Sequence, residues 1–227
     1  MRYYPIFLEL KNKNCLVVGG GPVGIRKAMT LEKCGAAVTV ISEKFAEGTT
    51  AFTGKKIIFT EKKYEKKDIQ GMFLVFAATN NAELNRKIKK DASGSHILCN
   101  VADAPDTSDF LVPSTVDRGD LIVAVSTSGT SPAMAKKIRQ ELEDFFDPAY
   151  VPLLCLMGNI RKKLLSAGHS PDEHKKAFSN LMDSGILDLI KTGDVAAVDL
   201  ILNEIFGKGY RYQELVSSRG MDECSDR

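Results

Sequence analysis

The sequence predicts an α/β fold: a Rossmann-type parallel-sheet domain, then a small α+β region, then an all-helical C-terminal domain. Three observations predict it. A short apolar run at residues 15–18 leads into glycines with the spacing G-x-G-x-x-G. Short apolar runs then alternate with amphipathic segments as far as residue 113. Beyond residue 150, apolar residues recur at helical spacing.

The glycine-rich turn contains Gly19, Gly21 and Gly24, between a buried strand and a helix that starts near residue 23. In this context the first glycine permits a tight turn, the second lets the backbone approach a pyrophosphate, and the third lets the helix pack on the strand. The free N–H groups and the dipole of the helix attract an anion. The turn therefore predicts a dinucleotide phosphate site.

A second strand at residues 37–42 is followed by Glu43. It lies about 20 residues after the glycines, where dinucleotide-binding sheets place the acidic residue that binds the adenosine ribose. A carboxylate there repels a 2′-phosphate, which favours NAD, although the adjacent Lys44 weakens this preference. The alternative is a structural strand–turn–helix with a solvated Glu43.

The other elements follow from periodicity and turn residues. A short alternating segment at 6–10 precedes the first strand, and Gly35 suits the left-handed end of the first helix. Three further strands are expected at 56–60, 72–78 and 97–101. A charged surface connection at 61–70 and a helix at 81–92 link them.

Two strands at 114–116 and 121–125 flank a turn that includes the tripeptide Arg118-Gly119-Asp120, which we interpret as turn chemistry rather than as an adhesion signal. A helix at 132–146 follows, with Ser131 as N-cap. The hairpin and helix are too small to bury their own apolar face, which predicts a homodimer. Further helices are expected at 150–166, from residue 170, and at 194–206.

Composition narrows the class of partner. The net charge of +2 gives no long-range attraction to nucleic acid, and no apolar run is long enough to span a bilayer. The N-terminus lacks the pattern of a secretory signal, which predicts a cytoplasmic location. Five scattered cysteines without a C-x-x-C pair, together with three dispersed histidines, predict reduced thiols and no preformed metal site. Small-molecule partners are expected.

Two stretches carry candidate chemistry. Asp103 follows the strand at 97–101, where a carboxylate could accept a proton; the alternative is a turn or capping role. The Ser/Thr/Gly loop at 126–131 offers hydroxyl and N–H groups that could hold an anion at a helix start, beyond the capping role of Ser131.

Six motifs occur in one order along residues 1–150, at 5–8, 18–28, 77–80, 99–105, 110–114 and 126–132. The fourth reads Cys-Asn-Val-Ala-Asp-Ala-Pro and the last Ser-Thr-Ser-Gly-Thr-Ser-Pro. Together they resemble the siroheme synthase N-terminal family, the precorrin-2 dehydrogenases and sirohydrochlorin ferrochelatases. Ala102 and Thr127 are mild departures at positions expected to vary.

The resemblance implies an NAD-binding domain at 1–113, a central dimerisation region at 114–149 and a helical domain at 150–216, with a disordered tail at 217–227. The sequence stops at Arg227, so we expect no fused methyltransferase domain and a separate enzyme that supplies precorrin-2.

The activity implied is NAD-dependent dehydrogenation of precorrin-2 to sirohydrochlorin, with insertion of Fe²⁺ into sirohydrochlorin as the family's second reaction. The substrate is a tetrapyrrole with acetate and propionate groups, and the family's catalytic carboxylate falls on Asp103. Cofactor contacts are expected at Gly19, Gly21, Pro22, Val23, Gly24, Ser42, Glu43, Lys44, Thr79, Asn80, Asn100 and Val101. Substrate contacts are expected at Ser114, Ser126, Thr127, Ser128, Gly129 and Thr130.

Two alternative functions also start from a dinucleotide-binding fold. A short-chain reductase needs a Tyr-x-x-x-Lys pair, and none of the six tyrosines has a lysine four residues later, which excludes that class. A non-catalytic, NAD-sensing dimeric module stays open, because fold alone does not separate it from an enzyme.

Overall fold

The computed structural model describes residues 2–45, 56–102, 104–168 and 171–217. They form two compact units. One contains the chain as far as Val112 together with Thr127–Ser131, and the other contains Pro113–Ser126 and the residues from Pro132 onward. The tail at 218–227 and the residues 169–170 before the fifth helix lie outside the described residues.

The first unit is built on a five-stranded parallel sheet with the order β3-β2-β1-β4-β5. The chain therefore runs outward from the centre and then returns to the other side of β1, which places a topological switch between β1 and β4. The strands are β1 Asn14–Val18, β2 Ala37–Ser42, β3 Ile57–Glu61, β4 Leu74–Ala77 and β5 Leu98–Val101.

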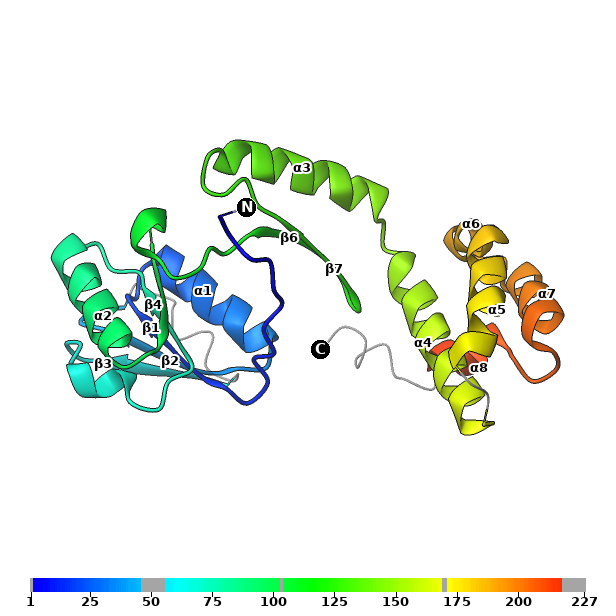
Figure 1. Cartoon of the computed structure of the whole chain (residues 1–227), viewed down its shortest axis with the longest axis horizontal. Helices are drawn as coiled ribbons and strands as arrows, with labels where there is room; N and C mark the ends of the chain where they lie inside the picture. The colour runs from blue at the N-terminus through cyan, green and yellow to red at the C-terminus, as the bar shows by residue number, and fades with distance from the viewer. Residues whose placement is uncertain (1, 46–55, 103, 169–170, 218–227) are drawn as a thin grey trace. The chain divides into compact units, whose positions relative to one another are not determined.

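Helices cover both faces of this sheet, with α1 Pro22–Lys33 on one and α2 Ala82–Gly94 on the other (Figure 1). Alternate residues of each strand enter the two cores, so Cys15 and Val17 face α1 while Leu16 and Val18 face α2. This double burial explains why the strands read as continuous apolar runs. Two short 3₁₀ helices, η2 Lys66–Ile69 and η3 Pro105–Thr107, lie in the connections.

The second unit begins with an antiparallel hairpin, β6 Ser114–Arg118 and β7 Leu121–Val125, against which α3 Pro132–Phe145 packs. The Arg118 guanidinium donates to the carbonyl oxygens of Phe146, at 2.6 Å, and Glu143, at 2.9 Å. It thereby satisfies carbonyls at the end of α3 that have no partner within the helix. The hairpin and helix predicted at this point are confirmed.

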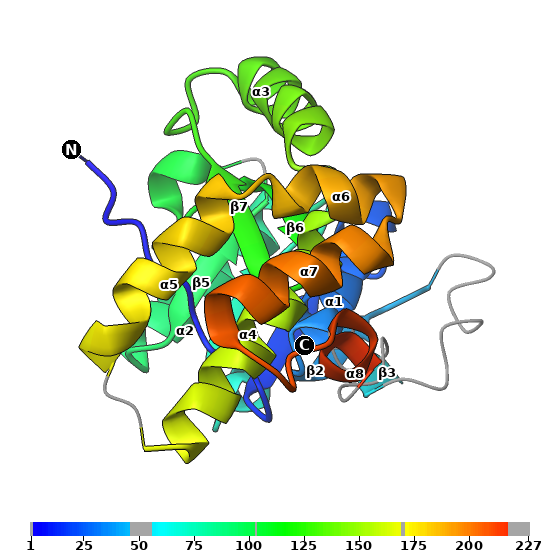
Figure 2. The same ribbon diagram turned by 90° about the vertical axis from the view of Figure 1, so that its right-hand side faces the viewer.

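The rest of the second unit is helical, as predicted (Figure 2). Its core contains the fully buried side chains of Leu156, Ile160, Leu181 and Leu202. The helices are α4 Tyr150–Ser166, α5 Pro171–Asp183, α6 Ile186–Thr192, α7 Val195–Phe206 and α8 Tyr212–Ser217.

The structure contains short elements that the sequence analysis did not predict. The alternating segment at 6–10 has no regular secondary structure, and Ile6 and Phe7 are 59% and 71% exposed. The helices α6 and α8 were not predicted individually; α6 spans seven residues between Gly185 and Gly193, which are both left-handed. Elsewhere, boundaries shift by one or two residues, as helix and strand ends commonly do.

Candidate active site at the carboxyl edge of the sheet

The carboxyl ends of four strands lie in register at one edge of the sheet. Val18 of β1 pairs with Ile41 of β2 and with Ala77 of β4, and Ala77 pairs in turn with Val101 of β5. The residues that follow these strands therefore emerge side by side at the switch between β1 and β4. This edge is where open parallel sheets bind their ligands.

Three glycines of the first loop are required by the fold itself. Gly19 has a φ of +128°, and a Cβ atom there would collide with the carbonyl oxygen of Ala78. A Cβ atom on Gly24 would collide with the carbonyl oxygen of Gly19, and one on Gly20 would lie 2.8 Å from the Lys44 oxygen. The loop is thus packed tightly against the ends of β2 and β4.

Gly21 differs from these glycines. Its φ of −81° and ψ of 175° are extended backbone that any residue adopts, and a Cβ atom there would meet no atom of the described residues within 4 Å. Packing within the unit therefore does not explain a glycine at this position. Open space above it is what close approach of a dinucleotide pyrophosphate requires, so the loop fits NAD.

The start of α1 also suits an anion. Gly21 is its N-cap, no side chain caps it, and no acidic residue occupies its first turn. The first N–H groups of a helix have no partner within the helix, and they carry the positive end of its dipole. Gly21, Pro22 and Val23 are all exposed at this point.

The turn after β2 lies beside the glycine loop, because the space beside Gly20 is filled by Ser42, Lys44 and Phe45. The Ser42 hydroxyl donates to the carbonyl oxygen of Lys44 at 2.6 Å, which fixes the turn. The side chains of Glu43 and Lys44 are exposed. Glu43 thus directly follows β2, in the turn that packs beside Gly20.

Thr79, which follows β4, is held by a residue that the sequence analysis missed. The Thr79 hydroxyl and N–H both donate to Oδ1 of Asn85, at 2.7 and 3.2 Å, and the Asn85 amide returns a hydrogen bond to the Thr79 carbonyl at 3.0 Å. Asn85 is buried on the inner face of α2 with Ile88 and Ala92. A polar residue on that apolar stripe was the available signal. Asn80 is exposed beside Thr79.

Asn100 and Val101 end β5, and both are buried. The Asn100 amide donates to the carbonyl oxygen of Phe110 at 2.9 Å, and the Phe110 ring packs edge-on against Phe76 at 5.5 Å between centroids. The chain is therefore fixed on both sides of the motif that contains Asp103. Asp103 itself lies outside the described residues.

A half-buried cation stands on the α1 face of the sheet. Nζ of Lys27 lies 5.9 Å from the centroid of the Phe76 ring, which attracts it electrostatically. Burial lowers the pKa of Lys27, and the charge of neighbouring Arg26 lowers it further. An anion bound nearby would raise this pKa again.

Part of the Ser/Thr/Gly loop belongs to the first unit. The Thr127 hydroxyl lies 3.1 Å from the Ser131 N–H and 2.9 Å from its carbonyl oxygen, which closes the loop, and Ser128 and Gly129 have φ values of 56° and 85°. A Cβ atom on Gly129 would lie 3.9 Å from Pro105. The structure thus brings Thr127, Ser128, Gly129 and Thr130 next to η3, while Ser114 and Ser126 belong to the second unit.

Two features of the described residues bear on partners. None of the described helices is both long and apolar enough to cross a bilayer. Among the same residues, no three His, Cys, Asp or Glu side chains are grouped so that they could hold a metal ion. Cys15 and Cys99 are buried thiols, as predicted, and burial raises the pKa of each to about 11.

Known proteins match the chain along most of its length. Residues 6–114 match a family model described as "Putative NAD(P)-binding", and residues 118–144 match one described as "Sirohaem biosynthesis protein central". The siroheme synthase of Vesicomyosocius okutanii is 40% identical over 188 residues, 82% of this chain and 40% of that protein. The siroheme synthase of Ruthia magnifica is 38% identical over 184 residues, 81% of this chain and 37% of that protein.

The chain therefore spans about 40% of the length of these curated relatives. Among solved structures, one described as "SirC, precorrin-2 dehydrogenase" superposes with a TM-score of 0.72 at 25% identity, covering 89% of this chain and 98% of that one. The fold class and the resemblance expected from the sequence are both confirmed.

Proposed function

The chain belongs to the siroheme synthase N-terminal family, and from that premise we propose that it catalyses the NAD-dependent dehydrogenation of precorrin-2 to sirohydrochlorin. The observation that carries the proposal is the carboxyl edge of the sheet. There the open position at Gly21, after β1, lies at the switch point, and β4 is the strand between β1 and β5.

The cofactor is NAD, and we assign its contacts from the geometry of this edge. The loop and first turn of α1 bind the pyrophosphate, and the turn after β2 binds the adenosine ribose. The ends of β4 and β5 lie toward the nicotinamide half of the molecule. When bound, NAD⁺ accepts a hydride. The proposed contacts to the pyrophosphate are Gly19, Gly21, Pro22, Val23 and Gly24. The proposed contacts to the adenosine ribose are Ser42, Glu43 and Lys44, and those to the nicotinamide half are Thr79, Asn80, Asn100 and Val101.

The dehydrogenation removes one hydride and one proton from the reduced ring, so the site must accept a proton. We assign this role to Asp103, which follows β5 in the sequence. The substrate is anionic, which suits a polar loop in which Ser128, Gly129 and Thr130 are exposed. The substrate contacts proposed are Ser114, Ser126, Thr127, Ser128, Gly129 and Thr130.

Insertion of Fe²⁺ into sirohydrochlorin is proposed as a second reaction of the same site, with iron as a substrate. It displaces two pyrrole N–H protons, and Asp103 would accept them one at a time, releasing each to solvent before it takes the next. The chain would act in the cytoplasm.

The proposed enzyme is a homodimer. The outward face of the β6–β7 hairpin exposes Ile122, at 48%, and the neighbouring helix α3 exposes Met134, at 50%, and Phe145, at 66%. These apolar side chains belong to the central region that the sequence analysis assigned to dimerisation. Association of two copies through this region would bury them.

The test is anaerobic incubation of the purified chain with precorrin-2, with and without NAD⁺, followed by absorption spectra. Conversion to sirohydrochlorin only in the presence of NAD⁺, with one NADH formed per product, supports the proposal. Binding of NAD⁺ without conversion would overturn it in favour of an NAD-sensing module. Addition of Fe²⁺ to the product mixture tests the second reaction.

A further inference from the structure

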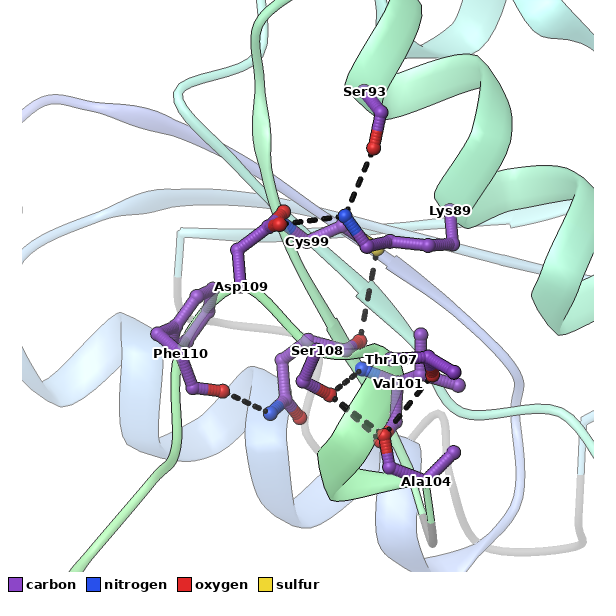
Figure 3. Close-up of polar contacts among 10 residues, drawn as sticks. Lys89, Ser93, Cys99, Val101, Ala104, Thr107, Ser108, Asp109 and Phe110 are labelled. Carbon is purple, nitrogen blue, oxygen red and sulfur yellow. Dashed lines mark hydrogen bonds and ion pairs between the residues drawn. The ribbon is translucent and has the colours of Figure 1, made fainter. Parts of the chain in front are cut away.

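The strand β5 forms one edge of the sheet. The chain then folds back along that edge, and side chains of the returning segment bond the backbone of β5 (Figure 3). An exposed edge strand presents unpaired N–H and C=O groups. Here Cys99 and Val101 direct such groups outward, and the returning residues Ser108 and Asp109 bind them. The turn between the two segments contains η3 and spans six residues, 102–107.

Asp109 anchors the returning chain. One carboxylate oxygen accepts the Cys99 N–H at 2.8 Å, and the Asp109 N–H donates to the Cys99 carbonyl at 3.0 Å. The other oxygen pairs with Nζ of Lys89 at 2.6 Å, and Lys89 also donates to the Ser93 hydroxyl at 2.8 Å. The carboxylate thus links β5 to α2, and both members of the ion pair are less than one-third exposed.

Ser108 closes the turn itself. Its hydroxyl oxygen accepts the Val101 N–H at 2.9 Å and lies 3.3 Å from the Val101 carbonyl and 3.2 Å from the Ala104 carbonyl. A hydroxyl has one proton, so it donates to one of these two carbonyls at a time. The Thr107 hydroxyl supports the same end of the turn, at 3.1 Å from the Ala104 carbonyl. One side chain therefore ties the residue where β5 ends to the residue where η3 begins.

Val101 and Ala104 stand on either side of Asp103 in the sequence. We propose that Ser108 is a positioning residue of the dehydrogenation: its hydroxyl fixes the backbone before and after the proposed base, while the Asp109–Lys89 pair holds Ser108 in place. This inference rests on the proposed function. Reactions of this kind depend on placement to within about 1 Å, and an error of that size can cost about 100-fold in rate.

The alternative is that Ser108 only protects the sheet edge. In that case its loss would reduce stability and every activity in parallel. A positioning role separates these quantities, because Ser108 bonds Val101 and Ala104 and not the glycine loop or the turn after β2, which are proposed to bind the pyrophosphate and the adenosine ribose. Val101 is a proposed contact at the nicotinamide end, so the Kd for NAD⁺ should change much less than kcat. Threonine carries its hydroxyl at the same position and adds one methyl group, so it can still make the two bonds and should restore what alanine removes.

The test compares Ser108→Ala, Ser108→Thr and the unmodified full chain in steady-state dehydrogenation with precorrin-2 and NAD⁺. The matched control is Ser166→Ala, because the Ser166 hydroxyl also bonds a backbone carbonyl, that of Lys162 at 2.9 Å, but in α4. The Kd for NAD⁺ and the Tm are measured for every variant. Hydrogen exchange of the Val101 amide reports whether the bond from Ser108 is lost.

We expect Ser108→Ala to lower kcat about 10- to 100-fold with a faster-exchanging Val101 amide, a Kd for NAD⁺ that changes much less than kcat and a Tm near that of the unmodified chain. Ser108→Thr should recover most of kcat, and Ser166→Ala should leave it unaltered. Unchanged kcat in Ser108→Ala overturns the inference, as does a fall in kcat that threonine does not relieve. If the unmodified chain binds NAD⁺ but gives no turnover, the proposed function is overturned and the role of Ser108 with it.

Discussion

The carbonyl oxygen of Gly19 lies where a Cβ atom of residue 24 would stand, whereas the space above Gly21 is open. The glycine loop therefore contains positions of two kinds, one set by packing and the other by a ligand. Substitution at each kind should have a different consequence.

We expect Gly24→Ala to destabilise the protein by about 3 kcal/mol, because the added atom collides with backbone. Gly21→Val should change the free energy of unfolding by only about 1 kcal/mol and yet weaken NAD binding at least about tenfold, because its side chain fills the proposed pyrophosphate position. Urea unfolding and calorimetric titration with NAD⁺ measure both effects. Unchanged NAD affinity in Gly21→Val would refute the placement of the cofactor.

Asp103→Ala tests the proposed base. General base catalysis contributes about 10²- to 10⁴-fold to a rate, so both dehydrogenation and iron insertion should slow by such factors. The Kd for NAD⁺ should not change, because Asp103 is not assigned to the cofactor. Full dehydrogenase activity in this variant would assign the proton to another acceptor. Loss of dehydrogenation alone would separate the two reactions.

The buried thiols predict a loss of stability at alkaline pH. Burial raises the pKa of Cys15 and Cys99 from 9.0 to about 11, so the folded state holds these protons more tightly than the unfolded state. Their contribution is complete below about pH 9 and is lost as the pH rises through about 11. Urea unfolding between pH 8 and 11 should therefore show a shallower decline in Cys15→Ala/Cys99→Ala than in the unmodified chain.

The control for that experiment is Cys34→Ala, since Cys34 is exposed at the end of α1. It should retain the decline of the unmodified chain. An equal slope in the double variant and the unmodified chain would show that other groups dominate the alkaline transition.

The proposed homodimer is tested on the outward face of the hairpin. Ile122→Glu places a charge on an apolar face that two copies would share, so sedimentation velocity should show a monomer at concentrations where the unmodified chain is dimeric. Leu200→Glu is the matched control, because Leu200 is an exposed apolar residue, at 71%, in α7 and outside that face. A dimer that persists in Ile122→Glu, or an unmodified chain that is monomeric, contradicts the proposal.

The parallel sheet was predictable because its strands are buried on both faces and its loops carry glycines at positions with strict geometric demands. The run at 15–18 and the spacing from Gly19 to Glu43 are local signals that tertiary context did not alter. The alternating segment at 6–10 shows the limit of such local signals. Its pattern suits a strand, but pairing requires a neighbour that no local sequence reveals.

The polar contacts of the site could not be predicted from the sequence. Asn85 bonds Thr79 across a loop, and Ser108 bonds Val101 across a turn, and such pairs depend on where the chain returns in space. The short helix α6 was not predicted, because its seven residues complete barely two turns and so are too few to establish a periodicity.

The hydrogen bonds of Arg118 bear on how the Arg-Gly-Asp tripeptide should be understood. The Arg118 guanidinium donates to the carbonyl oxygens of Glu143 and Phe146 at the end of α3, so its donors are used within the fold. Gly119 is left-handed, and its N–H is bound by Asp117, so the tripeptide is the corner of a hairpin. The tripeptide is therefore part of the fold: Gly119 makes the turn of the hairpin, and Arg118 ties the hairpin to the end of a helix.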